Sequence, residues 1–551
     1  QVEHAIRSIN GIEDVIVTAK KKENEDILCA FFISDGEITS QAIRTGLRTK
    51  LPSYMIPSVC IRMEAFPTNK SGKVDMRQLP DISFVQKMEA GDTKKGTKLE
   101  EQLREIYKEV LGLTNVGLDE NFFDLGGQSL KAMSMVNTVK KNLGKNMTVR
   151  DLMTYSTPRV LATFLEGASE VTLDPIRKII NRTGKYLQSD AQKRIFIVDQ
   201  FDEEGLSYNL PMAFEIFGEI DMNKLQRALE NMLQRNEILR TGFEVEGDNA
   251  YQIVHEEAMP DVEIMDISDM DIESDEERYA HTMEGFVRPF DLDKPPLMRV
   301  RVVKCKLSTV LMIDVHHIIA DGYTMNLLVK EFNALYNGEE LPEPMIQYCD
   351  YTEWMRNRDF DQDKRFWKER FANGVPKTEL FIGKKMKSRR SYKGDSCTRR
   401  LYTGARKDVI EFADRTNATE YMILLAVFSL VISRLSNQED IVIGTPIACR
   451  TRPELENMIG MTLNTLPIKL RAEGNKTFRE YLAGVRDYVL KVYDHQEYPL
   501  NDIAETLGMD YQTGSSPFDI LFILQNNESE QLAFGNMPMR KVEMDDRKIS
   551  K

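Results

Sequence analysis

The chain has 551 residues, more than a single hydrophobic core usually holds, so we expect two to four domains. Hydrophobic residues make up 42% and charged residues 29%, a balance that excludes global disorder. The net charge of −14 argues against a general nucleic-acid-binding surface. The longest apolar run, 421–432, falls short of the ~20 residues of a membrane-spanning helix and predicts a buried core helix. No secretion signal follows Gln1, and the lack of an initiator methionine leaves a start further upstream open.

The six cysteines are scattered and include no Cys-x-x-Cys pair. This spacing predicts neither a zinc site nor a disulfide framework, and it fits a cytoplasmic protein. Histidine is equally scarce, with six residues, yet His316 and His317 are adjacent.

Two polar stretches, 81–96 and 168–183, lack apolar periodicity and are predicted to be linkers. They separate blocks at 1–80, 97–167 and 184–551, and nearly all of the net negative charge lies in the last block.

In the first block, 15–17 and 27–33 have the apolar runs of strands, and 39–50 has a helical pattern. The second block has helical apolar stripes from 99 to 110 and from 133 to 139, which predict an all-helical domain. In the third block we expect a strand at 309–315 that ends at the paired histidines and a helix at 324–336. Helices at 405–416 and 419–435 and a strand at 440–444 complete a large α/β arrangement.

Three constellations have residue types that support chemistry. The first is the turn 67–75, in which Gly72 permits a tight bend and Lys73 follows it. A lysine on such a turn can reach a phosphate or a carboxylate as a point charge, but a solvated turn explains the same composition. A Gly-x-x-x-x-Gly-Lys-Ser/Thr phosphate loop does not occur in the chain.

The second constellation is 121–130, where Gly126 and Gly127 precede Ser129 at the expected start of a helix. Serine is a favoured helix N-cap, and capping explains it without any further function. Alternatively, another enzyme attaches a phosphate-linked group to the hydroxyl, where the helix N-terminus would stabilise the anion. Block 97–167 contains no histidine, so Ser129 is a poor candidate for a self-activated nucleophile.

The third constellation is His316-His317-Ile318-Ile319-Ala320-Asp321-Gly322. Successive strand residues face opposite sides, so the two imidazoles cannot do the same job. Asp321 can hold the turn or anchor a distant arginine. A metal site would need three or four converging ligands, so we expect no metal here. A buried structural pair and general acid/base chemistry both remain open.

In this order, the three constellations resemble those of a nonribosomal peptide synthetase, the class of enzyme that assembles many peptide antibiotics. Residues 1–80 resemble the small α+β C-terminal subdomain of an adenylation domain, and the resemblance implies that Lys73 is its catalytic lysine. Residues 97–167 resemble a four-helix-bundle peptidyl carrier domain, which implies 4′-phosphopantetheine on Ser129. Residues 184–551 resemble a condensation domain of the two-lobed α/β fold similar to chloramphenicol acetyltransferase.

Further condensation motifs appear in register at 189–194, 235–241, 348–351, 443–446, 459–466 and 495–499. The resemblance implies that His317 is the catalytic histidine, with His316, Asp321 and Gly322 completing its motif. It implies a structural ion pair for Asp321, for which we expect Arg450 to be the partner, and a supporting role for Arg194. Two residues depart from the family pattern: Asn236 replaces a usual histidine, and Gln128 replaces the common His or Asp before the carrier serine.

The implied reaction is aminolysis of an aminoacyl or peptidyl thioester on Ser129 by an amine on a downstream carrier domain. A phosphopantetheinyl transferase would install the prosthetic group. The large adenylation subdomain is absent, so we expect ATP and Mg²⁺ to serve only a complete adenylation domain and this chain to have no adenylation activity. We also expect the condensation domain to continue beyond Lys551.

The residues of these motifs resemble those of condensation domains that accept a donor of L configuration. A catalytically silent docking platform and an epimerase-type relative remain alternatives. A heterocyclising relative is disfavoured because the doubled histidine is not replaced by aspartates.

Overall fold

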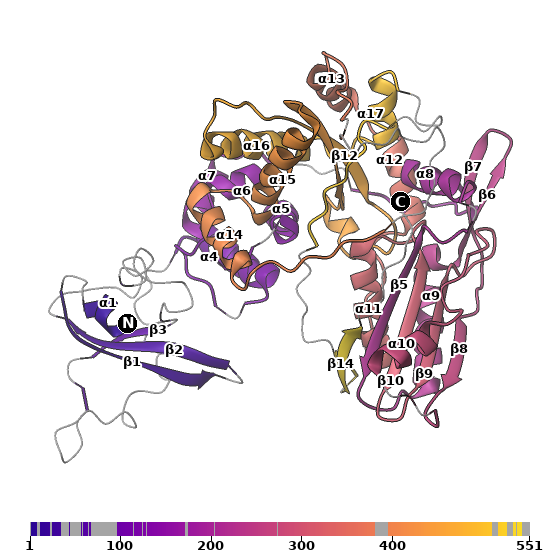
Figure 1. The fold of residues 1–551 in the computed structure, drawn as a ribbon, viewed down its shortest axis with the longest axis horizontal. Helices are drawn as coiled ribbons and strands as arrows, with labels where there is room; N and C mark the ends of the chain where they lie inside the picture. Colours follow the sequence, from indigo (N-terminus) through magenta and orange to yellow (C-terminus); the bar gives the residue numbers. More distant parts are fainter. Residues whose placement is uncertain are drawn as a thin grey trace. The chain divides into compact units, whose positions relative to one another are not determined.

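The computed structural model describes residues 2–7, 11–22, 25–34, 43, 57, 59–63, 66–67, 96–113, 115–123, 125–127, 129–170, 175–202, 204–270, 272, 274–378, 380, 395–509, 516–525, 533–535 and 537–542. The chain divides into two compact units, 1–98 and 99–551 (Figure 1).

The first unit is a small α+β structure. Helix α1 (Val2–Arg7) precedes the antiparallel pair β1 (Ile12–Lys22) and β2 (Glu25–Ser34), and β3 (Val59–Arg62) joins β2 in parallel. Val15, Ala30 and Phe32 are buried against Ile6 of α1, which confirms the two predicted strands. The predicted helix 39–50 lies outside the described residues except for Ile43, which is helical and buried.

The second unit begins with a helical bundle, as predicted. Its helices are α4 (Lys98–Leu111), α5 (Ser129–Leu143), α6 (Val149–Thr154) and α7 (Pro158–Glu166). Leu103, Ile106, Val136 and Val139 recur at helical spacing and are buried in one shared core. The threonines Thr148 and Thr157 cap the short helices α6 and α7.

The remainder of the unit forms two α/β lobes. The elements of the first lobe are β4 (Lys185–Leu187), α8 (Asp190–Asp199), β5 (Asn209–Ile216), α9 (Met222–Arg235), η3 (Glu237–Arg240), β6 (Thr241–Glu246), β7 (Asn249–Val254), β8 (Asp261–Asp266), α10 (Asp275–Met283), β9 (Met298–Lys304), β10 (Thr309–His316), α11 (Gly322–Tyr336) and α12 (Tyr348–Arg356). Among the described strands, the main sheet runs β13-β14-β5-β10-β9-β8, where β13 is Ala533–Phe534 and β14 is Met537–Val542, and β4-β7-β6 form a separate sheet.

Strand β10 lies at the centre of this main sheet, between β5 and β9, and it is buried along its whole length. Leu311, Ile313 and Val315 pack on one face in the core that also contains α9 and α11, whereas Val310 and Met312 pack on the other face. The period-two alternation of a strand therefore places helices over both faces of the sheet.

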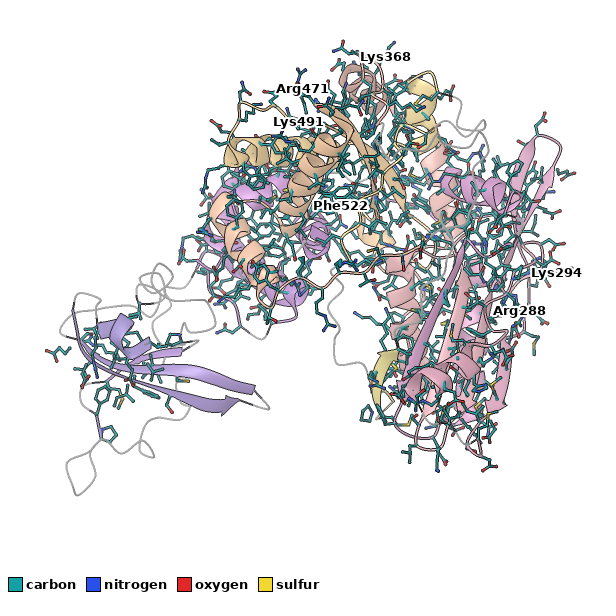
Figure 2. The ribbon with its side chains drawn as sticks, in the orientation of Figure 1. Arg288, Lys294, Lys368, Arg471, Lys491 and Phe522 are labelled. Carbon is teal, nitrogen blue, oxygen red and sulfur yellow. The ribbon has the colours of Figure 1, made fainter. Side chains whose placement is uncertain are left out.

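The second lobe consists of α13 (Asp361–Arg370), α14 (Ala405–Thr416), α15 (Glu420–Ser436), β11 (Asp440–Ile447), η4 (Pro453–Leu455), β12 (Asn464–Arg471), α16 (Phe478–Tyr493) and α17 (Leu500–Thr506). Strands β13 (Ala533–Phe534) and β14 (Met537–Val542) return to the first lobe and extend its sheet. Figure 2 shows Lys368, Arg471 and Lys491 on the outside of the second lobe and Phe522 inside it, where its ring lies 5.2 Å from that of Phe428.

The apolar run 421–432 lies in helix α15, which packs Met422, Leu425 and Ala426 into the core of the second lobe, as predicted. Val427 and Val431 lie on its exposed side. No helix in the described part of the chain is long and apolar enough to cross a membrane.

The predicted linker 168–183 makes specific contacts where the structure describes it. Asn146 N donates to Ser169 O at 3.0 Å, and the Ile179 backbone N–H donates to the Asp350 carboxylate at 2.8 Å. Arg182 adds two hydrogen bonds to the same carboxylate, each 2.9 Å long.

Candidate active site

Strand β10 ends between the two adjacent histidines: His316 is its last residue and His317 lies beyond it. His316 continues the strand face of Met312 and Asp314, and His317 begins the turn that leads to α11. The backbone N–H of His316 donates to Leu297 O at 3.0 Å, and that of His317 donates to Tyr208 O at 2.7 Å. Both backbone positions are therefore fixed, although the two rings occupy different surroundings.

The His316 ring is held on both nitrogens. Its Nδ1 accepts a hydrogen bond from Ile318 N at 3.2 Å, so this nitrogen does not carry a proton. Its Nε2 lies 3.3 Å from Oδ1 of Asp199, the last residue of α8, and is therefore the protonated nitrogen. A buried ring with both nitrogens engaged is suited to holding the turn and not to exchanging protons with a substrate.

The His317 ring is less buried than that of His316. It packs edge-on against the Tyr208 ring, with 6.1 Å between the ring centroids. Of the two imidazoles, His317 is therefore the more exposed.

Asp321 closes the turn as the N-cap of α11. Its Oδ1 accepts from Thr324 N at 2.8 Å, and its Oδ2 accepts from Thr462 N at 3.0 Å. Arg450 Nη2 lies 3.8 Å from Oδ1, so the structure brings together the two residues that the sequence analysis paired. A buried carboxylate with these partners ties α11 to the segment before β12 and is not available as a base.

The Arg450 guanidinium is enclosed by acceptors. It donates to the carbonyl of Leu455, to Met458 O at 2.7 Å and to Gly460 O at 3.1 Å. It also donates to Thr324 Oγ1 at 2.9 Å, so it binds both the loop 455–460 and the first turn of α11. Cys449, directly before it, has φ +49, a left-handed conformation that non-glycine residues rarely adopt.

Packing requires glycine at only one of the two glycine positions of this region, Gly460 and Gly322. At Gly460, φ is +150 and a Cβ would lie 2.2 Å from the Tyr348 ring, so packing requires glycine there. At Gly322, a Cβ would meet nothing within 4 Å. Packing does not demand glycine at position 322, and its missing side chain leaves open space beside the motif.

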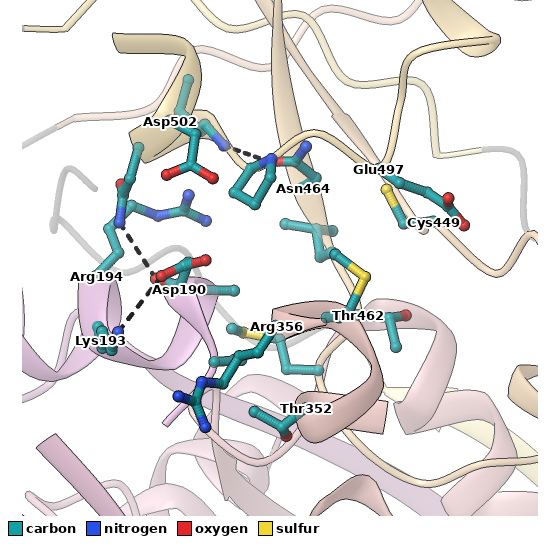
Figure 3. A pocket seen from close by; sticks show the side chains of 18 of the residues that line it. Asp190, Lys193, Arg194, Thr352, Arg356, Cys449, Thr462, Asn464, Glu497 and Asp502 are labelled. Atoms are coloured by element: carbon teal, nitrogen blue, oxygen red, sulfur yellow. Dashed lines mark hydrogen bonds and ion pairs between the residues drawn. The ribbon is translucent and has the colours of Figure 1, made fainter. Parts of the chain in front are cut away.

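A cavity of about 270 Å³ lies between the lobes (Figure 3). It is lined from α8 by Asp190, Lys193 and Arg194, from α12 by Thr352 and Arg356, and from the second lobe by Thr462, Asn464, Glu497 and Asp502. Helix α8 begins at this cavity and ends at Asp199 beside His316. Its length places the cavity and the His316 end of the helix about 15 Å apart. The pKa of Asp502 is raised to about 6. Burial, which removes water from the carboxylate, is the larger cause, and the nearby negative charge of Asp190 is the second.

The carrier motif precedes helix α5. Gly126 has φ +91, and a Cβ on buried Gly127 would lie 2.2 Å from the Phe122 ring. These glycines allow a sharp turn into α5, of which Ser129 is the first residue. Lys73 of the first unit lies outside the described residues.

Several residues of the site were missed in the sequence analysis. Asp199 stands ten residues beyond the start of the 189–194 motif, and Thr324 has no motif signal of its own. Thr462 lies within the 459–466 motif, which indicated the segment but not its contact with Asp321. Asn236, the departure from the family pattern, is structural: its Nδ2 donates to Glu331 Oε1 at 2.6 Å.

Residues 182–550 match the family model described as "Condensation domain", which covers more than half of the chain. The chain belongs to the condensation-domain family. Residues 101–165 match "Phosphopantetheine attachment site", and residues 1–73 match "AMP-binding enzyme C-terminal domain". The chain is thus a nonribosomal peptide synthetase segment that joins the end of an adenylation domain, a carrier domain with a phosphopantetheine attachment site and a condensation domain.

Gramicidin S synthase 2 of Brevibacillus brevis is 35% identical over 542 residues, which are 97% of this chain and 12% of that protein. Tyrocidine synthase 3 of Brevibacillus parabrevis is 34% identical over 549 residues, 98% of this chain and 8% of that protein. The chain therefore spans a small fraction of these relatives.

Two solved structures show the same fold. The X-domain from teicoplanin biosynthesis has a TM-score of 0.59 at 21% identity, covering 67% of this chain and 84% of that one. Holo-AB3403, a four-domain nonribosomal peptide synthetase, has a TM-score of 0.56 at 20% identity, covering 65% of this chain and 28% of that one. The predicted two-lobed condensation fold is confirmed.

Proposed function

We propose that this chain forms an amide bond by aminolysis of a thioester, with the donor acyl group on Ser129 and the acceptor amine on a downstream carrier domain. One observation supports the proposal: the buried His316 ring has both nitrogens in hydrogen-bonding contact, and the His317 ring is the more exposed of the two. Asp321 and Arg450 hold the turn on which His317 stands and do not enter the chemistry.

The role of His317 follows from the energetics. An α-amine has a pKa of ~7.7–8.0, so a useful fraction is neutral near pH 7. General-base help is typically worth ~10²–10⁴-fold, whereas orienting two tethered reactants contributes up to ~7–11 kcal/mol. We therefore assign positioning the larger share: His317 hydrogen-bonds the amine and accepts its proton late, as the nitrogen attacks and the thiolate leaves.

The start of α5 fits the prosthetic group. The helix dipole at this N-terminus favours the phosphodiester that would join Ser129. When bound, 4′-phosphopantetheine supplies the thiol that holds the acyl group as a thioester. Gly126 and Gly127 allow the sharp turn that precedes Ser129. A phosphopantetheinyl transferase is the partner required to attach the prosthetic group.

The cavity between the lobes supports access for the acceptor. Its cationic side chains Lys193 and Arg194 suit an anionic arm, and α8 leads from them to the histidine turn. The open space at Gly322 suits passage of an arm beside the motif.

We further propose an L-configured donor and a cytoplasmic setting. We also propose that this segment does not adenylate, because only the C-terminal part of an adenylation enzyme matches. An epimerase would return a D-configured aminoacyl group without an amide product, and a silent platform would return neither. Chiral analysis of the released product separates these alternatives.

The test begins with intact mass after incubation with a phosphopantetheinyl transferase and coenzyme A. One added prosthetic group is expected, and Ser129→Ala should abolish it. With donor and acceptor loaded, His317→Ala should slow amide formation strongly but leave a measurable residual rate. Failure of the loaded chain of parent sequence to form an amide would overturn the proposed reaction. Complete loss in His317→Ala, with normal loading, would instead make His317 an obligatory base.

A further inference from the structure

Arg450 takes part in two contacts at once. Its side chain holds Thr324 and Gly460 behind the histidine motif, as described above. Its backbone carbonyl accepts a 2.9 Å hydrogen bond from Nδ2 of Asn137, which belongs to helix α5 of the carrier domain. Asn137 lies eight residues after Ser129, about 12 Å further along the same helix.

The surroundings of Asn137 form an interface between the carrier and the second lobe. Asn137 is completely buried, and Ser134, one turn earlier, donates to Glu456 Oε1 at 3.3 Å. A shallow cavity at the edge of this contact is lined by Lys140 and Arg150 from the carrier and by Arg452 and Asp494 from the second lobe.

The interface also buries charged and polar groups. Burial lowers the pKa of Lys140, with nearby Arg452 adding to the effect, and burial raises the pKa of Glu456. Each charged group therefore loses solvation when the domains meet. In addition, Asn137 Oδ1 has no hydrogen-bond partner among the described residues. Carrier side chains Met153, Val149 and Phe123 also pack against the apolar core of the second lobe, so the interface combines apolar packing with buried polar groups.

The strained backbone lies at the same place. Cys449, with φ +49, immediately precedes the carbonyl that receives Asn137, and its thiol donates to Gln496 O at 3.1 Å. A non-glycine residue held in this conformation depends on its neighbours to keep it there. A contact on the next carbonyl is well placed to support that conformation.

We propose that Arg450 is a positioning residue shared by two sites: its carbonyl is the docking point for Asn137 of this chain's own carrier, and its guanidinium supports the turn that presents His317. Docking of the loaded carrier then steadies the catalytic turn, and undocking relaxes it. The inference rests on the proposed function, since it assigns the carrier as the donor.

The test uses the full chain and two matched variants of helix α5. Asn137→Asp keeps the shape of the side chain but cannot donate to the carbonyl and places a charge against it. Asn142→Asp makes the same change at an exposed position of the same helix. Asp494→Lys reaches the interface from the condensation side, at the C-cap of α16 where a cation is tolerated.

Hydrogen exchange gives a readout independent of activity. We expect faster amide exchange across 447–462 and 318–325 in Asn137→Asp and in Asp494→Lys, but not in Asn142→Asp. Equal exchange in Asn137→Asp and Asn142→Asp, with Asp494→Lys unchanged, would overturn the proposal.

Transfer rates give the second readout. An L-aminoacyl group loaded on Ser129 from aminoacyl-coenzyme A is compared with the same group on soluble N-acetylcysteamine. Loss of one buried hydrogen bond predicts a drop of about threefold to tenfold for the carrier-bound donor in Asn137→Asp. The apparent KM for the soluble donor should stay at the parent value. An equal drop for both donors would overturn docking as the cause. If the parent chain forms no amide from either donor, the proposed function fails, whereas the exchange data still decide the docking.

Discussion

The substitution Asp321→Asn tests whether this aspartate holds the turn or takes part in the reaction. Both of its oxygens accept hydrogen bonds from backbone N–H groups, those of Thr324 and Thr462. An amide can present only one acceptor oxygen, so one of these donors will face the NH₂ group. The change also removes the negative charge beside the buried guanidinium of Arg450.

The expected cost follows from these contacts. A hydrogen bond to a charged acceptor is worth ~1.5–3 kcal/mol, and breaking a buried ion pair costs ~3–5 kcal/mol. Arg450 keeps the carbonyls of Met458 and Gly460, and its distance to Asp321 is 3.8 Å, so the ion-pair loss should be well below that range. We expect the free energy of unfolding to fall by about 3 kcal/mol.

Urea unfolding followed by tryptophan fluorescence measures this loss. Both tryptophans of the chain, Trp354 and Trp367, lie in the condensation domain, so the signal reports that domain and not the carrier. With a slope of ~1–3 kcal/mol/M, the midpoint should shift down by about 1–3 M.

The control is Asp221→Asn, the same change at an exposed helix N-cap, where asparagine serves equally well. A normal midpoint in Asp321→Asn combined with lost amide formation would refute the structural role and make the carboxylate a reacting group.

Three further outcomes are expected. Gly127→Ala should abolish phosphopantetheine attachment without changing the serine, because its Cβ would lie 2.2 Å from the Phe122 ring; intact mass checks this, and normal loading would contradict the packing argument. Gly322→Leu should leave the urea midpoint unchanged but slow amide formation, because a Cβ there meets nothing within 4 Å and a larger side chain would narrow the space beside the motif; a fall in the midpoint would contradict this reasoning. Asp502 has a folded-state pKa of about 6, above its usual 3.8, so its contribution to stability is present below pH ~4 and is lost as the pH rises through 6. Asp502→Asn should therefore raise stability at pH 7 by about 1 kcal/mol, after allowance for solvent screening, and flatten its pH dependence between pH 4 and 6; a parent-like urea profile would contradict the pKa.

Local patterns predicted the elements that carry the site. The apolar run before the paired histidines predicted a strand at 309–315, and β10 spans Thr309–His316. Helix α14 occupies the predicted 405–416, and α11 begins two residues before the predicted start. These predictions succeed because burial on both faces of a strand, or on one face of a helix, imposes a period that the sequence displays directly.

The linker 168–183 was predicted less well. Its polar composition indicated a mobile tether, but Ile176 is buried and Asp350 binds both Ile179 and Arg182. The partner that holds this segment lies more than 160 residues further along the chain, and no local pattern reports it.

The sequence by itself determined the domain order, the attachment residue and the histidine motif of this protein. These are properties of short, contiguous residue patterns whose spacing is visible in one dimension. Only the tertiary structure decided that both nitrogens of the His316 ring have partners, because Asp199 and Ile318 meet it from different elements. It also decided that Arg450 pairs with Asp321 and accepts a hydrogen bond from Asn137, since contacts between residues so far apart in the sequence arise only when the lobes and the carrier pack together.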